Sequence, residues 1–311
     1  MNICRCQPGS RDRLHQVAFM LGVVTVGLVG FAQEPVAVFG VRDRQVGQFD
    51  SPLISESSGV VASRKQVGVF WTHNDSGNAP QIFAVSRTGE MKGTFSVDAL
   101  NADWEDIATD DEGHLYLADI GNNLRWRTEL SIYQLDEPDV LTPAAPTTQP
   151  GNPLKVKRTW KVVFPKNVEP FDAESFFVWR GQGYVVSKVF KRAQATLYRF
   201  PLDESDGPKQ MEAVTPLPIY VPCTGADLSV DGTQMVIVTR EGPSLFHLTE
   251  AGRFDGLSDA PFRRATGTDH TTEAVCFAPA QADAPAGVLG TAESGKVFFF
   301  PFDAFRKASN P

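Results

Sequence analysis

Four motifs that define common enzyme classes are missing from this sequence. It has no G-x-S-x-G, no H-E-x-x-H, no glycine-rich phosphate loop and no C-x-x-C. Each motif fixes a nucleophile, a metal ligand or a phosphate cradle in a local geometry, so their absence disfavours standard serine hydrolases, zinc proteases and nucleotide enzymes. A metal-bound hydroxide needs no serine nucleophile, and a metal-dependent hydrolase therefore stays open.

Charge is also scarce, and its balance is acidic. Only 21% of the 311 residues are charged, and the formal net charge is -8. Neutralising phosphates requires a surplus of Lys and Arg, which argues against nucleic acid as the main partner. The hydrophobic fraction of 42% is large enough for a sizeable core and rules out global disorder.

No apolar run reaches the length of a membrane span. The longest, residues 17–32, has 16 residues, against about 20 for a transmembrane helix. Three arginines precede it (Arg5, Arg11 and Arg13), and Gly30 and Ala32 form a small-x-small cleavage site. We predict a signal peptide over 1–32, a secreted or periplasmic location, and a mature chain 33–311 without a stable membrane span. An uncleaved signal anchor is the alternative.

Helical periodicity is absent from the mature chain, and a repeat takes its place. Five segments share one order: an acidic residue, a short apolar strand, a turn, a second strand, and a third strand with Phe or Tyr. The acidic residues are Glu56, Glu105, Glu174, Asp227 and Glu273. A repeat of about 50 residues with three or four strands is typical of a β-propeller.

We therefore predict an all-β fold, a single β-propeller domain of five blades with four antiparallel strands each. Six blades are the alternative, if the Pro-rich insert in 138–165 hides a degenerate blade. The fifth segment has no outer strand of its own before the chain ends. The stretch 35–47 is a spare strand, and we expect it to close the last blade, which removes exposed edges.

Cysteine is rare, and the repeat predicts its state. Of the four cysteines, only Cys223 and Cys276 follow the signal. Aligned on the acidic residues they are seven positions apart, which is on the order of 20 Å in an extended strand. A disulfide needs Cα atoms within about 7 Å. We predict two free, largely buried thiols.

The repeat also predicts where polar side chains gather. The first strand of a blade is innermost and antiparallel to the second, so starts of first strands and ends of second strands meet at one mouth of the central channel. The acidic residues above belong to the first set. The second set includes His73, Asp75, Asp119, Lys188 and Arg240.

A ring of carboxylates requires compensation because like charges repel. Ca²⁺ accepts six to eight oxygen ligands and suits such a ring. The candidate metal ligands are Glu56, Glu105, Asp119, Glu174, Asp227 and Glu273. In the structural alternative these side chains accept backbone N–H groups of the neighbouring blade, and Lys188 and Arg240 neutralise the rest.

The candidate catalytic residues come from the same mouth. His73 beside Asp75 could act as a general base, and Lys188 or Arg240 could stabilise an anionic transition state. A lone histidine in a polar loop is more often simply solvated. We expect a monomeric exported propeller that binds a small-molecule or protein ligand at an acidic channel mouth, with Ca²⁺ as candidate cofactor. A metal-dependent hydrolase of phosphate esters or lactones is the alternative.

The segments DWEDIATDDEGHLYLADIGNN, WTHNDSG and FDAES resemble exported propellers of the TolB-like, SdiA-regulated and esterase-like phytase neighbourhood. This resemblance implies export and, often, calcium binding near the propeller axis. Its members include phosphatases, lactonases and non-catalytic modules. Only the five axial acids that begin the repeats match in type and place.

Overall fold

Short β-strands account for nearly all the regular structure of this chain. The computed structural model describes residues 44–140, 152–190, 193–259, 262–267 and 270–307. Within them the only helical elements are two 3-10 turns, Leu257–Asp259 and Phe302–Ala304. No described residues form a helix long and apolar enough to span a membrane. The predicted signal peptide, 1–32, lies outside the described residues.

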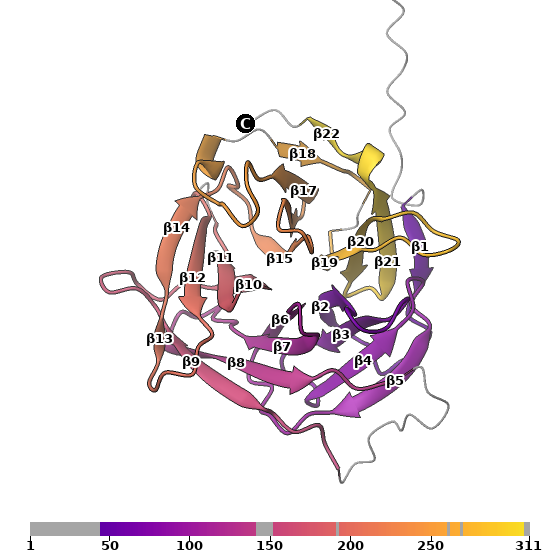
Figure 1. Ribbon diagram of the computed structural model, residues 1–311, viewed down its shortest axis with the longest axis horizontal. Helices are drawn as coiled ribbons and strands as arrows, with labels where there is room; N and C mark the ends of the chain where they lie inside the picture. The colour runs from indigo at the N-terminus through magenta and orange to yellow at the C-terminus, as the bar shows by residue number, and fades with distance from the viewer. Residues whose placement is uncertain (1–43, 141–151, 191–192, 260–261, 268–269, 308–311) are drawn as a thin grey trace, which may run out of the picture. The chain divides into compact units, whose positions relative to one another are not determined.

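The strands form five antiparallel sheets around a central axis, which makes the fold a five-bladed β-propeller (Figure 1). Blade I contains β2 (Ser57–Ala62), β3 (Phe70–Asn74), β4 (Gln81–Val85) and β5 (Met91–Ser96). Blade II contains β6 (Trp104–Thr109), β7 (His114–Asp119), β8 (Glu129–Asp136) and β9 (Arg158–Val163). Blade III contains β10 (Ala173–Trp179), β11 (Gln182–Ser187), β12 (Thr196–Pro201) and β14 (Glu212–Pro216).

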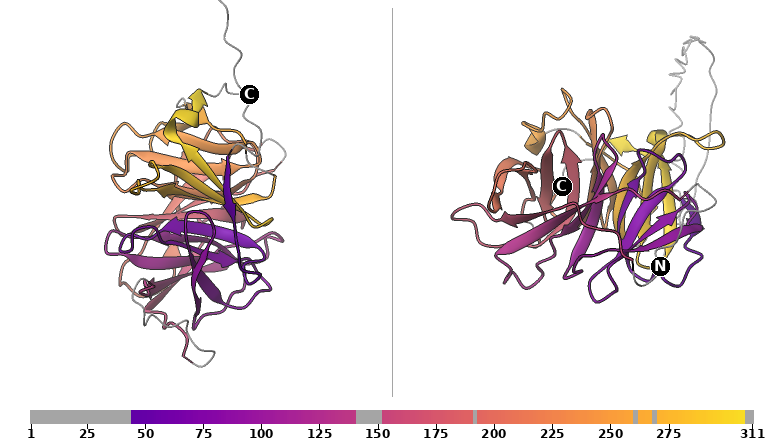
Figure 2. Two further views of the ribbon diagram at one scale, coloured as in Figure 1. Left: turned by 90° about the vertical axis from the view of Figure 1, so that its right-hand side faces the viewer. Right: turned by 60° about the horizontal axis from the view of Figure 1, so that its bottom comes forward.

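The last two blades lie between blade III and blade I. Blade IV contains β15 (Cys223–Leu228), β16 (Gln234–Thr239), β17 (Gly242–His247) and β18 (Phe262–Arg264). Blade V contains β19 (Thr272–Ala278), β20 (Gly287–Ala292), β21 (Lys296–Pro301) and β1 (Gln45–Gln48). The inner strands β2, β6, β10, β15 and β19 each contact the inner strands of both neighbouring blades, so the ring is closed. Figure 2 shows the sheets from the side.

The N-terminal strand closes the last blade, as the sequence predicts. β1 pairs antiparallel with β21, Gln45 opposite Phe298 and Gln48 opposite Lys296. The spare strand was expected over 35–47, and the part of it before residue 44 lies outside the described residues. The chain thus joins its first described strand to its last blade.

Two short strands were not expected. β13 (Lys209–Gln210) leaves blade III and pairs in parallel with β9, and β22 (Arg306–Lys307) pairs with β18 of blade IV. The chain end thus adds a strand to blade IV, whereas the outer strand of blade V is β1. The sheets of blades II and IV have five strands, because the outer strands β9 and β18 still offer unpaired N–H and C=O groups to a further strand.

The hydrophobic core consists of five clusters, each between two neighbouring blades. Successive side chains of a strand point to opposite faces. Val60 accordingly packs towards blade V, whereas Val61 packs towards blade II. Because both faces of each blade are covered, the inner strands are buried along their length; β2 and β6 are buried at every residue. Cys223 and Cys276 are free and buried, as predicted.

The closure can be tested with a matched pair of glycines. A Cβ on Gly47 of β1 would lie 2.0 Å from the backbone oxygen of Thr88, whereas one on Gly290 of β20 would meet nothing nearer than 3.4 Å. We expect Gly47→Ala to lower the free energy of unfolding by about 1–3 kcal/mol through overpacking, and Gly290→Ala to leave it nearly unchanged. Denaturant unfolding measures both. Equal stability of the two variants would show that β1 does not press against blade I.

Candidate functional site

Every inner strand carries the same irregularity at its start. In each blade the register between first and second strand shifts by one residue, so one residue of the first strand has no partner. These bulged residues are Ser58, Glu105, Glu174, Thr224 and Glu273. A bulge re-aims a side chain. Three of the five blades therefore place a glutamate at the same point of one channel mouth.

The bulges correct the repeat alignment at two positions. Glu56 lies two residues before the bulge of blade I, and Asp227 lies three residues after the bulge of blade IV. Neither residue therefore occupies the bulge position at which the other three predicted acids, Glu105, Glu174 and Glu273, stand. The position two residues before the bulge, which Glu56 occupies in blade I, holds Asp103 in blade II and Asp172 in blade III. The repeated spacing Asp-x-Glu was the signal that could have identified both.

Three carboxylates from blades I and II converge at the mouth. Carboxylate oxygens of Asp75, Asp103 and Glu105 lie within 4.8 Å of one another. The backbone of Gly121 lies against them, because a Cβ there would come within 2.2 Å of Glu105 Oε1 and 2.3 Å of Asp103 Oδ2. Burial raises the pKa of all three groups, and the negative charge of Asp75 and Asp103 adds to this at Glu105.

A second group of charges lies beside it in blade III. Lys188 Nζ contacts Glu174 Oε1 and lies 3.8 Å from Asp172 Oδ2. Asp172 is buried; its Oδ1 accepts the Asn122 N–H at 2.8 Å, and its Oδ2 has no hydrogen-bond partner among the described residues. Burial raises the pKa of Glu174 to about 8 in spite of Lys188. For Lys188, the neighbouring carboxylates outweigh burial and raise the pKa.

Blade V contributes the third glutamate. Burial raises the pKa of Glu273 to about 7, with a further contribution from the charge of Glu293. Arg240 at the end of β16 is exposed, and its charge acts in the opposite direction on Glu273. The mouth thus holds more carboxylate than cationic charge.

Inside the channel, Asp106 joins three blades. Its Oδ1 accepts the N–H of Ile107 at 2.9 Å, and its Oδ2 accepts the N–H of Phe176 in blade III at 2.8 Å and that of Ala226 in blade IV at 3.4 Å. The side chain is completely buried, which raises its pKa well above the usual range although these bonds oppose the shift.

The remaining predicted acids have local partners. Asp227 accepts the N–H of Leu228 and of Phe277 in blade V, both at 2.8 Å. Asp119 is buried and bonds to Arg127 at 2.7 Å, and the exposed Glu56 accepts a bond from Asn78 at 2.7 Å. The structural alternative thus describes Asp227, which accepts a backbone N–H of the next blade, and Glu174, which is paired with Lys188.

His73 is buried and does not face the solvent of the mouth. Its Nδ1 lies 3.0 Å from the backbone oxygen of Asn74, and its ring packs edge-on against Trp104 at 5.8 Å. Burial lowers its pKa to about 4, so the ring is neutral at pH 7. Asp75, its expected partner in catalysis, belongs to the carboxylate cluster instead.

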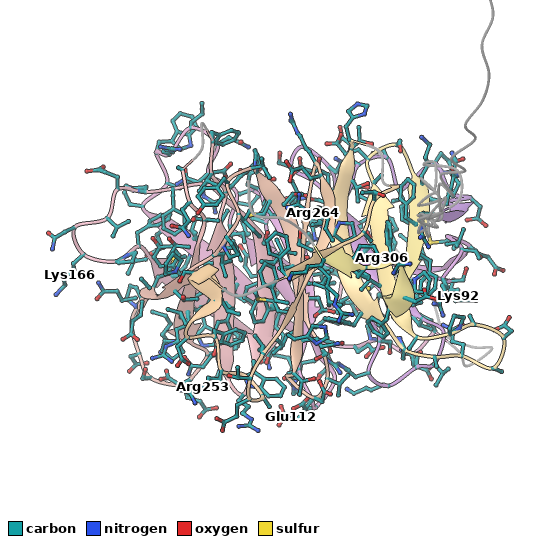
Figure 3. All side chains as sticks on the ribbon, turned by 90° about the horizontal axis from the view of Figure 1, so that it is seen from above. Lys92, Glu112, Lys166, Arg253, Arg264 and Arg306 are labelled. Carbon is teal, nitrogen blue, oxygen red and sulfur yellow. The ribbon has the colours of Figure 1, made fainter. Side chains whose placement is uncertain are left out.

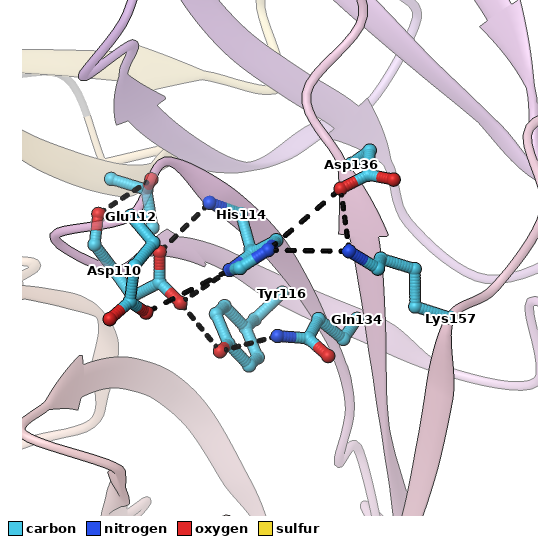
Figure 4. A network of polar contacts seen from close by, with 8 residues as sticks. Asp110, Glu112, His114, Tyr116, Gln134, Asp136 and Lys157 are labelled. Carbon is cyan, nitrogen blue, oxygen red and sulfur yellow. Dashed lines mark hydrogen bonds and ion pairs between the residues drawn. The ribbon is translucent and has the colours of Figure 1, made fainter.

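A separate polar network lies at the opposite end of blade II, where β6 turns into β7. His114 Nδ1 lies 2.8 Å from Asp110 Oδ2, which also accepts the Tyr116 hydroxyl at 2.8 Å (Figure 4). Lys157 Nζ lies 3.4 Å from His114 Nε2. Seen edge-on, Glu112 of this turn lies at the lower edge of the ring together with Arg253 (Figure 3). With both ring nitrogens facing charged neighbours, His114 is a structural member of this network.

No family model and no curated protein matches this sequence. Among solved structures it is similar to Kuenenia stuttgartiensis hydrazine synthase, with 11% identity and a TM-score of 0.42, covering 80% of this chain and 72% of that one. It is also similar to the structure of U3-55K, with 9% identity and a TM-score of 0.39, covering 81% of this chain and 63% of that one. A nidogen/laminin complex is similar with 14% identity and a TM-score of 0.35, and the match covers 81% of this chain and 82% of that one. A likeness this distant carries no functional inference, and the propeller fold rests on the sheets described above.

The role of Asp106 can be measured directly. Asp106→Ala leaves three buried N–H groups without an acceptor, and each costs about 1–3 kcal/mol. We expect a loss of at least about 3 kcal/mol in the free energy of unfolding. Asp106→Asn retains one oxygen acceptor and should lose less. If Asp106→Ala unfolds at the wild-type denaturant concentration, the carboxylate does not hold the blades together.

Glu273 should give the protein a pH-dependent stability. Its pKa rises from 4.5 to about 7 on folding, so the folded state binds more protons between these values. The contribution of Glu273 to the free energy of unfolding is then highest below about pH 4.5, falls as the pH rises to about 7, and is constant above that pH. We expect Glu273→Gln to melt at a higher temperature than wild type at pH 8 and at an equal temperature at pH 4.5. Glu112→Gln, at a side chain that is 78% exposed, is the control and should show no such crossover.

Proposed function

We propose that this protein is a non-catalytic, exported binding propeller whose acidic mouth holds Ca²⁺ and, through it, a ligand or protein partner. The observation that carries the proposal is the convergence of Asp75, Asp103 and Glu105 with their oxygens within 4.8 Å of one another. Carboxylate oxygens are the ligands that Ca²⁺ prefers. With one oxygen from each side chain, the three carboxylates supply three of the six to eight oxygens it takes, which leaves positions for water or for an oxygen of the ligand.

Three further features support a cation at this point. The Gly121 backbone packs directly against Asp103 and Glu105, so that any side chain there would displace both carboxylates. Burial and mutual repulsion disfavour the ionised form of these carboxylates, and a bound cation would stabilise that form. The buried Asp172 Oδ2, without a hydrogen-bond partner among the described residues, lies beside the same cluster and acts on Glu105.

The expected affinity follows from the expected location. An exported protein meets calcium at millimolar concentration, and extracellular calcium modules bind with Kd of about 0.1–1 mM. The resemblance to exported propellers that often hold calcium near their axis agrees with this proposal. It does not specify the ligand.

A metal-dependent hydrolase of phosphate esters or lactones is the second candidate. It is favoured by Glu174, because burial raises the pKa of its carboxyl, and a carboxyl with a raised pKa can donate a proton. Lys188 beside it could stabilise an anion. We rank this candidate lower because His73, the expected base, is buried and has its Nδ1 against the Asn74 carbonyl.

Calorimetric titration with CaCl₂ tests the calcium site. We expect wild type to bind one Ca²⁺ and to melt at a higher temperature with Ca²⁺ than with EDTA. Glu105→Gln removes one ligand charge, and Gly121→Ala displaces the Asp103 and Glu105 carboxylates by steric contact. Both should weaken binding at least tenfold, because each tenfold change needs only about 1.4 kcal/mol.

The controls are Glu90→Gln for the loss of charge, at a side chain that is 67% exposed, and Gly290→Ala for the added methyl group. Both should bind Ca²⁺ as wild type does. If wild type shows neither heat nor a shift in melting temperature at 10-fold the expected Kd, about 10 mM Ca²⁺, the proposal is wrong. Turnover of a phosphate-ester or lactone panel that Glu105→Gln abolishes, with the fold retained, would favour the hydrolase instead.

A further inference from the structure

The channel has a second, chemically different end. A cavity of about 610 Å³ lies among the turns that join first and second strands in blades I, IV and V, away from the acidic mouth. Its apolar wall includes Val61, Val67, Leu228, Val230, Phe277 and Phe302. Val67 is 78% exposed and Val230 is 63% exposed at its rim. Volumes of about 300–1,000 Å³ with apolar walls are usual for small-molecule sites.

The hollow results from small residues in blade V. At the ends of β19 and β20 this blade lines the cavity with Ala278, Pro279, Ala280 and Ala286. Short side chains on one wall leave space that the neighbouring blades do not fill.

One cationic side chain on the wall, Arg64, interacts with its neighbour Asp227 through charge alone. Arg64 lines the cavity, and its guanidinium makes no hydrogen bond or ion pair with any described residue. Its Nη1 is buried, whereas the other nitrogens remain accessible. The acid nearby, Asp227, has each carboxylate oxygen occupied by a backbone N–H, of Leu228 and Phe277. Arg64 thus offers several N–H donors beside an apolar wall.

We infer that this cavity binds a small carboxylic acid with an apolar body, its carboxylate on Arg64 and its hydrocarbon against the valines and phenylalanines. A guanidinium pairs with a carboxylate through two parallel hydrogen bonds, and desolvated apolar surface supplies the remaining affinity. This site is independent of calcium at the acidic mouth. Its occupant differs in chemistry because the mouth gathers carboxylates, whereas the wall here is largely apolar and carries Arg64 beside Asp227 and Asp231.

Titration of the full chain with decanoate, below its micelle concentration, tests the inference. We expect saturable binding of one decanoate, unchanged by EDTA, and at least about tenfold weaker binding of decanol because a charged hydrogen bond contributes about 1.5–3 kcal/mol. Arg64→Met should weaken decanoate binding by a similar factor and leave decanol binding unchanged. Arg263→Met, the same loss of charge on exposed β18, should bind decanoate as wild type does.

A second variant keeps the test independent of charge. Ala280→Trp places an indole at an exposed position of the rim and should abolish binding of both probes while the melting temperature stays near that of wild type. No binding to wild type, equal effects of Arg64→Met and Arg263→Met, or full binding by Ala280→Trp would each overturn the inference. So would a wild-type dimer that Val230→Asp converts to monomer, because a second copy would then cover the cavity.

Discussion

The Asp106 carboxylate is the interaction on which the rest of the ring depends. It accepts one N–H from its own strand and one each from blades III and IV, so a single buried group fixes the inner strands of three blades. Other junctions have their own inner polar bonds: Ser58 with the Glu105 carbonyl, Ser57 with Thr291, and Thr224 with the Thr272 carbonyl. Because an unsatisfied buried N–H is costly, these bonds hold the blades in register and leave little freedom at the axis.

Fixed inner strands explain how the two ends of the channel differ. At one end the bulges aim Glu105, Glu174 and Glu273 into a common mouth, where burial and repulsion raise the carboxyl pKa values. At the other end, small residues of blade V leave an apolar cavity with Arg64 on its wall. The five interblade clusters of hydrophobic side chains stabilise the ring and offset the cost of the charged mouth. Sites that a fold stabilises against local cost are where function is expected.

Much of the fold could be predicted from sequence, and part of the site. Strand order, five blades, closure by the N-terminal strand and two free thiols follow from a repeat and from the lengths between its members. Glu105 and Asp75 were found, but Asp103 and Asp172 were missed, although each stands two residues before a predicted glutamate. Asp227 was placed three residues out of step. The alignment was anchored on acidic side chains, whereas the structure repeats a backbone bulge, which in two blades carries Ser58 and Thr224.

The sequence by itself determined that this chain is an all-β ring, because the repeat of apolar strands and turns is a local property that each segment carries within itself. It also determined that the mouth would be acidic, because the acids stand at the strand starts. Only the tertiary structure decided which carboxylates meet, that His73 is buried, and that Asp106 spans three blades. Those outcomes depend on contacts between blades and on a one-residue shift in pairing, and a shift of one residue moves a side chain to the opposite face.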